Sequence, residues 1–214
     1  YDRFGKGTGY HSTEFHWRVP IDEESWRYGH NVRHHGNTNV AGKDPDIHFG
    51  PIRLTEHTPW HDYHRFLEPF ALGVLFPTFA FMMNMHFTGV HDLWFGNSRG
   101  GMDMLEDRSR KTWLTAHWKL LRKYVPYYLY EFGLFPLLAG PFWWKVLLGN
   151  WLAETMRDIY SAATIFCGHI GEETAAYPEG DKASSRGAWY ARQVEATNDF
   201  SVPYALSVLC GGLD

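Results

Sequence analysis

The sequence has only two cysteines, Cys167 and Cys210, which stand far apart and without C-x-x-C spacing. This spacing indicates neither a disulfide framework nor a thiolate zinc site. Basic residues are also too few for a basic face: 20 Lys and Arg against 24 Asp and Glu give a formal net charge of −4. With a pI near 6.4, this balance argues against a nucleic-acid partner. The length of 214 residues fits one domain or one compact membrane unit.

Histidine, by contrast, is plentiful, with 13 residues, and three of them fall within six positions: His30, His34 and His35. Residues 23–35 predict a helix with Asp22 as its N-cap. Because each helical residue turns the chain by about 100°, His30 and His34 share one face, and His35 reaches the same ion or a second ion beside it. Imidazole suits zinc, copper, iron and nickel alike. The spacing therefore predicts a metal cluster without naming the metal.

Apolar residues are concentrated in two regions, although the mean hydropathy of −0.37 is typical of a soluble protein. Residues 66–90 carry one charge and are long enough to cross about 30 Å of hydrocarbon. Residues 124–169 are largely apolar and are interrupted at Ala139-Gly140-Pro141. We expect membrane helices, and a soluble protein with buried helices is the alternative. Tryptophans flank both regions, as interfacial belts do: Trp60, Trp94, Trp143, Trp144 and Trp151.

The predicted architecture is all-α, with integral membrane helices and a cytosolic helical cap that carries the metal site. We expect a single domain over residues 1–214. Residues 1–65 form a cytosolic histidine-box region, residues 66–168 the membrane region with a polar loop at 91–123, and residues 169–214 the cytosolic cap.

Topology adds one constraint, because His169 stands at the polar end of the last apolar stretch. If His169 joins the cluster, the number of crossings between them is even. Length favours residues 66–90 and 142–167 as the two crossings, with 125–140 interfacial. The basic residues of the polar loop favour a helical hairpin over 125–167 instead. We expect the arrangement that length favours.

Three segments resemble the integral-membrane fatty acid desaturases, which hold two irons with three histidine boxes. The second box and the loop after it are matched by WRYGHNVRHHGNTNVAGKDPDI. An extra histidine after the last transmembrane helix is matched within IFCGHIGEE, and the stretch before the third box by GAWYARQVEATNDF. The resemblance spans nearly the whole chain, and these segments in this order are specific. It implies four metal ligands: His30, His34, His35 and His169.

The chain also departs from the family pattern. The first box would lie before Tyr1 and the third after Asp214, so we expect an internal fragment that is inactive alone and binds iron weakly or not at all. Acyl-CoA desaturases have an Asn one turn before the extra histidine, where this chain has Ile165; Asn198 is the expected water-mediated ligand instead. Each ligating imidazole normally donates its other N–H to a carboxylate or carbonyl. The candidate partners are Asp44, Asp46, Glu172, Glu173 and Asp199.

The resemblance implies oxygen-dependent insertion of a cis double bond into a fatty acyl chain carried on a lipid or a thioester. Two non-haem iron ions and O2 would supply the oxidising power, so no protein base is required. Electrons would come from an external donor such as ferredoxin, a reductase or cytochrome b5. The protein would be integral to the membrane, with its metal site on the cytoplasmic face. Two alternatives remain open: a membrane di-iron hydroxylase or ketolase, and a non-catalytic membrane protein whose histidines bind zinc.

Overall fold

The computed structural model describes residues 5–9, 11, 13–49, 52–95, 103–199 and 201–209. Most of these residues are helical, which confirms the all-α prediction at this level. The described strands are limited to a two-residue antiparallel ladder between β1 (His48–Phe49) and β2 (Ile52–Arg53) and one bridge between Val40 and Tyr177.

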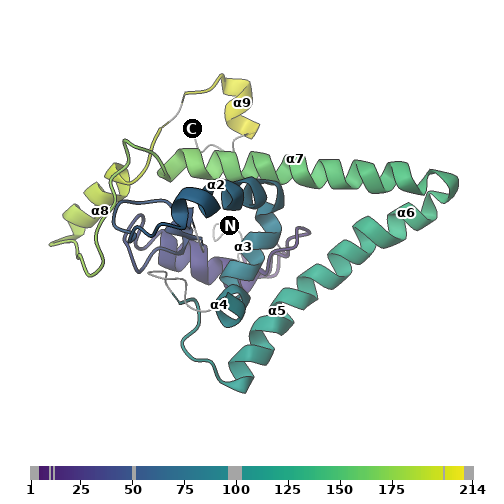
Figure 1. Cartoon of the computed structure of the whole chain (residues 1–214), viewed down its shortest axis with the longest axis horizontal. Helices are drawn as coiled ribbons and strands as arrows, with labels where there is room; N and C mark the ends of the chain where they lie inside the picture. Colours follow the sequence, from purple (N-terminus) through teal and green to yellow (C-terminus); the bar gives the residue numbers. More distant parts are fainter. Residues whose placement is uncertain are drawn as a thin grey trace.

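A long helical hairpin dominates the shape of the molecule (Figure 1). Its first arm is continuous from α5 (Arg110–Leu129) through the π-helix η4 (Tyr130–Leu134) to α6 (Phe135–Leu138). A 3-10 turn, η5 (Gly140–Phe142), connects it to the second arm, α7 (Trp143–His169). The arms diverge from this turn, and the rest of the chain packs at their open end. We call residues 110–169 the hairpin, and residues 13–95 with 170–199 the head.

The helix predicted over residues 23–35 is present, but it changes character. It begins as α1 (Glu23–Trp26), where the Asp22 carboxylate accepts a hydrogen bond from the Ser25 amide at 2.9 Å, as expected of an N-cap. It continues as a π-helix, η1 (Arg27–His34). There each amide bonds to the carbonyl five residues back.

The first apolar stretch does not form one straight rod. It comprises α2 (His64–Leu75), the 3-10 turn η3 (Phe76–Thr78) and α3 (Phe79–Phe87), and α3 runs away from the direction of α2 (Figure 1). Pro77 lacks an amide hydrogen, which breaks the helical ladder at this bend. Among the described helices, only His64–Phe87 passes a test of length and apolarity for crossing a membrane, and a buried helix of a soluble protein passes the same test.

Helices also occupy part of the expected polar loop at 91–123. They are α4 (Val90–Phe95) and the first half of α5, whose N-cap is Ser109; residues 96–102 lie outside the described residues. Beyond the hairpin, the chain forms α8 (Arg186–Glu195) and α9 (Tyr204–Leu209).

The head is packed against both arms of the hairpin. One buried cluster includes Phe79, Met83 and Phe87 of α3 together with Ala162 of α7. A second joins Met85 and Val90 to α5 through Ala116, Leu120 and Tyr124. Full burial of each large apolar side chain stabilises the fold by about 1.5–3 kcal/mol. These clusters hold the two arms at a fixed position relative to the histidine-bearing helix.

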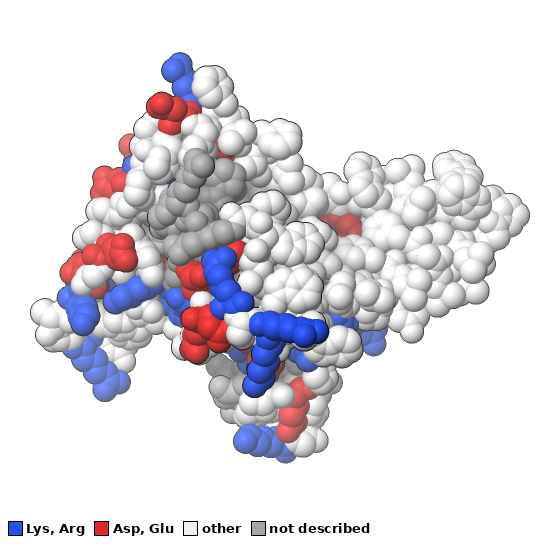
Figure 2. Space-filling model, turned by 60° about the horizontal axis from the view of Figure 1, so that its bottom comes forward, with Lys and Arg blue, Asp and Glu red and all other residues white. Residues whose placement is uncertain are grey.

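The far end of the hairpin carries almost no charge. Residues 132–153 contain a single charged side chain, Lys145, and the projecting end of the molecule is free of acidic and basic colour over most of its surface (Figure 2). Its large apolar side chains are exposed: Leu137, Leu138, Phe142, Trp143, Trp144, Leu148, Trp151 and Leu152. Such a contiguous apolar surface indicates contact with another protein or with a membrane.

Candidate metal centre

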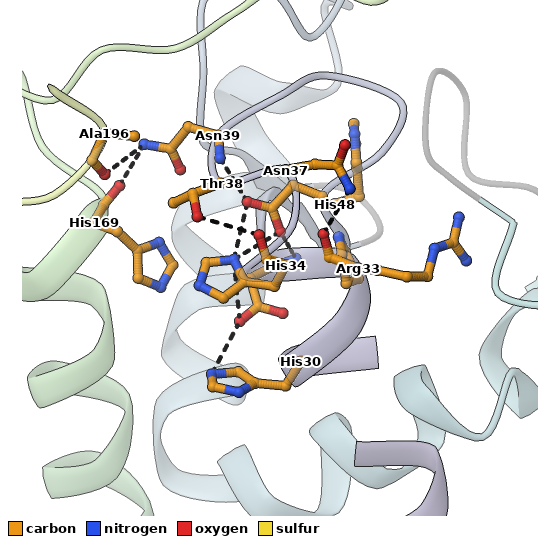
Figure 3. Close-up of polar contacts among 12 residues, drawn as sticks. His30, Arg33, His34, Asn37, Thr38, Asn39, His48, His169 and Ala196 are labelled. Carbon is orange, nitrogen blue, oxygen red and sulfur yellow. Dashed lines mark hydrogen bonds and ion pairs between the residues drawn. The ribbon is translucent and has the colours of Figure 1, made fainter. Parts of the chain in front are cut away.

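The structure brings together all four histidines that the sequence singled out. Ring centroids of His30, His34 and His35 lie 4.7–5.1 Å apart, and His169, at the end of α7, lies 4.6 Å from His34. The rings of His34 and His169 approach each other from different elements, with His30 one turn below (Figure 3).

The π geometry of η1 explains why three histidines of one helix meet. In an α-helix, residues five apart point about 140° apart, so His35 would turn away from His30. In η1 the His35 amide instead bonds to the His30 carbonyl at 3.1 Å, which returns His35 to the same side. Gly29 lets η1 approach α3 closely, because a Cβ atom there would lie 2.0 Å from the Phe87 ring. The sequence predicted the helix but not this widened turn.

Hydrogen bonds fix the tautomers of two of the rings. His34 Nδ1 lies 2.9 and 3.0 Å from the two carboxylate oxygens of Asp44, and His30 Nδ1 lies 3.0 Å from the side-chain oxygen of Asn31. An acceptor at Nδ1 places the proton on that nitrogen and leaves the Nε2 lone pair free for a metal. Asp44 also accepts hydrogen bonds from the backbone amides of Asn39 and Asp46.

Asp46 lies inside the cluster, closer than an outer partner needs to be. Its Oδ2 atom is 3.9 Å from His30 Nε2 and 3.8 Å from His34 Nδ1, and one donor atom from each of these residues lies within 4.8 Å of the others. The carboxylate is only 2% exposed, and neither oxygen has a hydrogen-bond partner in the described chain. Burial raises the pKa of Asp46 to about 7. A bound cation would compensate the negative charge of the ionised Asp46 carboxylate, so Asp46 is a candidate direct ligand of the metal.

The ring of His169 is buried, and neither of its nitrogens has a partner among the described residues. Unmet buried polar atoms cost about 1–3 kcal/mol each. Burial lowers the pKa of both His169 and His30 to about 4, so both rings are neutral near pH 7, as metal ligands must be. At His34 burial also lowers the pKa, but the bond to Asp44 and the charge of Asp46 outweigh it and the pKa is raised. This set of nitrogen and oxygen donors fits a first-row transition metal, including iron.

Asn39 is a positioning residue that sequence reasoning missed. Its side-chain amide donates to the carbonyls of His169, Ala175 and Ala196 at 2.8–3.2 Å, and so ties the end of α7 and the cap to the loop after η1 (Figure 3). Its φ of 55° is left-handed, a conformation that Asn adopts more readily than most residues. The only available signal was the turn-forming run Gly36-Asn37-Thr38-Asn39.

Helix α8 docks onto the same loop through two residues of the GAWYARQ stretch. The Trp189 indole donates to the Gly36 carbonyl at 3.1 Å, and the Thr38 hydroxyl donates to the Gln193 side-chain oxygen at 2.8 Å. These contacts place the third recognised segment directly against the histidine segment.

The remaining predicted site residues lie further out. The Asn198 backbone amide donates to the Gly168 carbonyl at 2.8 Å, and its side-chain amide lies against Gly171. Glu172, Glu173 and Asp199 are exposed, and no hydrogen bond or ion pair links them to the four histidines in the described part of the chain. Their roles as water-mediated ligand and outer partners stay predictions.

Comparisons with known proteins agree with this site. Residues 13–214 match the family described as fatty acid desaturase. An NADPH-dependent stearoyl-CoA 9-desaturase of Mycobacterium tuberculosis is 27% identical over 95% of this chain and 46% of its own length. An acyl-lipid (8-3)-desaturase of Mortierella alpina is 29% identical over 82% of this chain and 38% of its own length.

A third relative, an sn-1 linoleoyl-lipid 6-desaturase of Synechocystis sp., is 25% identical over 92% of this chain and 53% of its own length. The chain thus spans about half the length of these relatives, or less. No solved structure gives a significant match. The family match covers nearly the whole chain and includes every residue of the histidine cluster, so the chain belongs to the fatty acid desaturase family.

Proposed function

We propose that this protein is a fatty acid desaturase that inserts a cis double bond into an acyl chain carried on a lipid or a thioester, with O2 as co-substrate. The observation that carries the proposal is the convergence of four histidines on buried polar atoms that lack partners. The names of the relatives, which include a stearoyl-CoA and two acyl-lipid desaturases, support both kinds of carrier.

The residues that would hold two iron ions are His30, His34, His35 and His169, together with Asp46. When bound, the irons would supply the oxidation of an unactivated methylene by O2. The chain's own groups position and protect this chemistry. Asp44 and Asn31 orient the Nε2 atoms of their histidines. Electrons would come from an external donor: ferredoxin, a reductase or cytochrome b5.

We place both arms of the hairpin across the membrane, rather than residues 66–90 together with 142–167, the pair that length favours. At about 1.5 Å per residue, the 27 residues of α7 extend about 40 Å, enough to cross the hydrocarbon. Except for Lys145, the acidic and basic side chains of this arm are paired: Arg157 bonds to Glu154 and Asp158, and Tyr127 of the first arm bonds to Glu154 and Arg157. Paired charges that face the bundle are the kind that membranes tolerate.

A crossing hairpin also satisfies the topological constraint, because its two arms return the chain to the face from which it left. The metal centre would then lie on the cytoplasmic face, with η5 on the opposite face. Reagents that modify cysteine test this placement at Gly140→Cys in η5 and at Asp62→Cys in the head. Labelling of both positions from the same side of sealed vesicles would contradict it.

The activity is tested in the complete reading frame, expressed in a membrane host whose acyl chains are profiled by mass spectrometry. We expect new monounsaturated chains and about two irons per protein, both lost in His34→Ala. The control is His16→Ala, because the His16 side chain is exposed and lies outside the cluster. Hydroxylated products without an alkene would identify a hydroxylase instead. Bound zinc with an unchanged acyl profile would identify a non-catalytic metal-binding protein.

A further inference from the structure

A row of indole rings leads from the metal cluster to the surface of the head. The Trp26 ring stacks on His30 with centroids 4.4 Å apart and an interplanar angle of 19°. Trp17 meets Trp26 edge to face, with centroids 5.2 Å apart. Among the ring contacts of the described residues, Trp26 is the one Trp or Tyr ring that touches any histidine of the cluster.

Trp17 and Trp26 both pack against the buried cluster of the head, and the backbone of Trp17 is anchored by polar contacts. The Trp17 amide donates to the Glu23 carboxylate at 2.6 Å, and the Trp17 carbonyl accepts from the Lys123 ammonium at 2.7 Å. Lys123 and Glu23 also pair with each other at 2.6 Å. The Trp26 ring packs edge to face against Phe87 at 5.2 Å. The row is therefore a fixed feature of the head rather than a transient contact.

Trp17 is the outer end of the row. It lines a surface cavity of about 470 Å³ that it shares with Arg18 and Tyr130, among other residues. Both Trp17 and Trp26 are partly buried, and Trp17 is the member of the pair that lines this cavity. An electron hole that reached Trp17 would be able to leave the protein.

Indole is among the most easily oxidised side chains, and contact between rings permits electron exchange. We propose that Trp26 and Trp17 form a one-electron relay that removes an oxidising equivalent from the metal cluster when no acyl chain consumes it. The inference rests on the proposed function, because only oxygen chemistry at the cluster generates such an equivalent. It adds a protective route for this site that desaturation itself does not require.

The electrons and protons of the relay balance in four steps. Trp26 would give one electron to the oxidised iron cluster, and Trp17 would then give one electron to Trp26. The oxidised Trp17 loses its indole N–H proton to water in the cavity and becomes a neutral radical. A small thiol in solution then returns one hydrogen atom to Trp17 and becomes a thiyl radical.

The experiment uses the full-length iron-loaded protein without acyl substrate and hydrogen peroxide as the oxidant. Freeze-quenched samples are examined by electron paramagnetic resonance for a tryptophan radical, and oxidised tryptophans are mapped by mass spectrometry. In the wild type we expect iron-dependent oxidation of Trp17, above that of Trp60, an exposed ring outside the row. In Trp26→Phe, oxidation of Trp17 should fall to the level of Trp60. Trp26→Tyr, which restores an oxidisable ring of similar shape, should restore it.

A purely structural role for Trp26 would not separate Phe from Tyr, so equal oxidation of Trp17 in both variants at equal iron content would overturn the relay. Trp17→Phe gives an independent arm, in which oxidation should stop at Trp26; an unoxidised Trp26 there would also overturn it. Iron content and monounsaturated product are measured on the same preparations. Product formation without relay behaviour overturns the relay alone, whereas absence of iron and product overturns the proposed function.

Discussion

The metal cluster of the head and the far end of the hairpin differ in what they bury and what they expose. The head buries charge: Asp44 is 0% exposed and Asp46 is 2% exposed. The hairpin exposes apolar side chains, with Leu137 at 76% and Trp143 at 54%. A soluble domain keeps charged groups outside and rarely shows large apolar patches. The contrast supports the proposal that the two regions are built for different surroundings, a cation inside the head and hydrocarbon outside the hairpin.

Helix α7 of the hairpin reaches into the metal cluster beside the head, which makes the contrast a functional one. Its first residue, Trp143, is exposed at the far end of the hairpin, and its last residue, His169, is buried in the metal cluster. The other arm is tied to the head by polar contacts, since Arg122 of α5 bonds to Asp22, the N-cap of the histidine helix. The position of the hairpin therefore helps to set the spacing of the ligands.

The largest effect on the head should come from Asp44→Ala. This carboxylate accepts from His34 and from two backbone amides, all of which would lose their partner. Breaking such a buried pair costs about 3–5 kcal/mol. We expect chemical denaturation to show a loss of unfolding free energy of this size, together with loss of iron. The control is Asp62→Ala, because Asp62 is an exposed aspartate of the head. An equal loss of unfolding free energy there would show that the buried hydrogen bonds of Asp44 are not the cause.

The hairpin is tested by Leu152→Arg, which places a charge on an exposed apolar position near the middle of α7. In a membrane helix this substitution costs about 2.5–3.5 kcal/mol, whereas at a water-exposed surface it changes stability by less than about 0.5 kcal/mol. We expect the variant to insert poorly into microsomes. Val194→Arg, at an exposed position of α8, should insert normally. Equal insertion of the two variants would show that the hairpin does not face lipid.

The substitution Asp46→Asn should stabilise the protein without metal but weaken its binding of iron. Without a cation, removal of a buried charge that lacks partners should raise the melting temperature. With iron, the loss of a charged donor should weaken binding, by about 10–100-fold if it resembles other supporting groups of metal sites. Thermal unfolding with and without chelator, together with an iron titration, measures both effects. A lower melting temperature both with and without iron would mean that the Asp46 carboxylate stabilises the fold itself, through a contact within the protein.

Two substitutions at Asn39 distinguish the contribution of its backbone conformation from that of its side-chain hydrogen bonds. Asn39→Gly keeps the left-handed φ but loses the amide that holds the carbonyls of His169, Ala175 and Ala196. Asn39→Ala loses both. We expect each variant to lose about 1–3 kcal/mol from unmet buried carbonyls, with Ala the worse. If Gly matched the wild type in unfolding free energy and iron affinity, the hydrogen bonds of Asn39 would be irrelevant to the position of His169.

The sequence was sufficient for the helical class and for the capped histidine helix, because spacing and capping are local signals. His169 came from the family resemblance alone, and the structure places its ring beside that of His34. The sequence was insufficient for the π geometry of η1, where Gly29 packs closely against Phe87. It also missed Asn39, whose partners are more than 100 residues away for all three side-chain bonds. Which acidic side chains lie beside the histidines was the hardest feature to predict from the sequence. Asp44, Asp46 and Glu172 all follow histidines, and only tertiary packing separates them.

The smallest effect should come from the acids of the cap. Glu172 and Glu173 follow His169 closely in sequence, but they are exposed and have no contact with the cluster among the described residues. Neutralising a solvated carboxylate changes stability by less than about 0.5 kcal/mol. We therefore expect Glu172→Gln with Glu173→Gln to keep wild-type iron affinity, in contrast to Asp46→Asn. A loss of iron affinity comparable to that of Asp46→Asn would mean that residues 170–199 close over the metal when iron is bound. Glu172 and Glu173 would then be buried beside the metal rather than solvated.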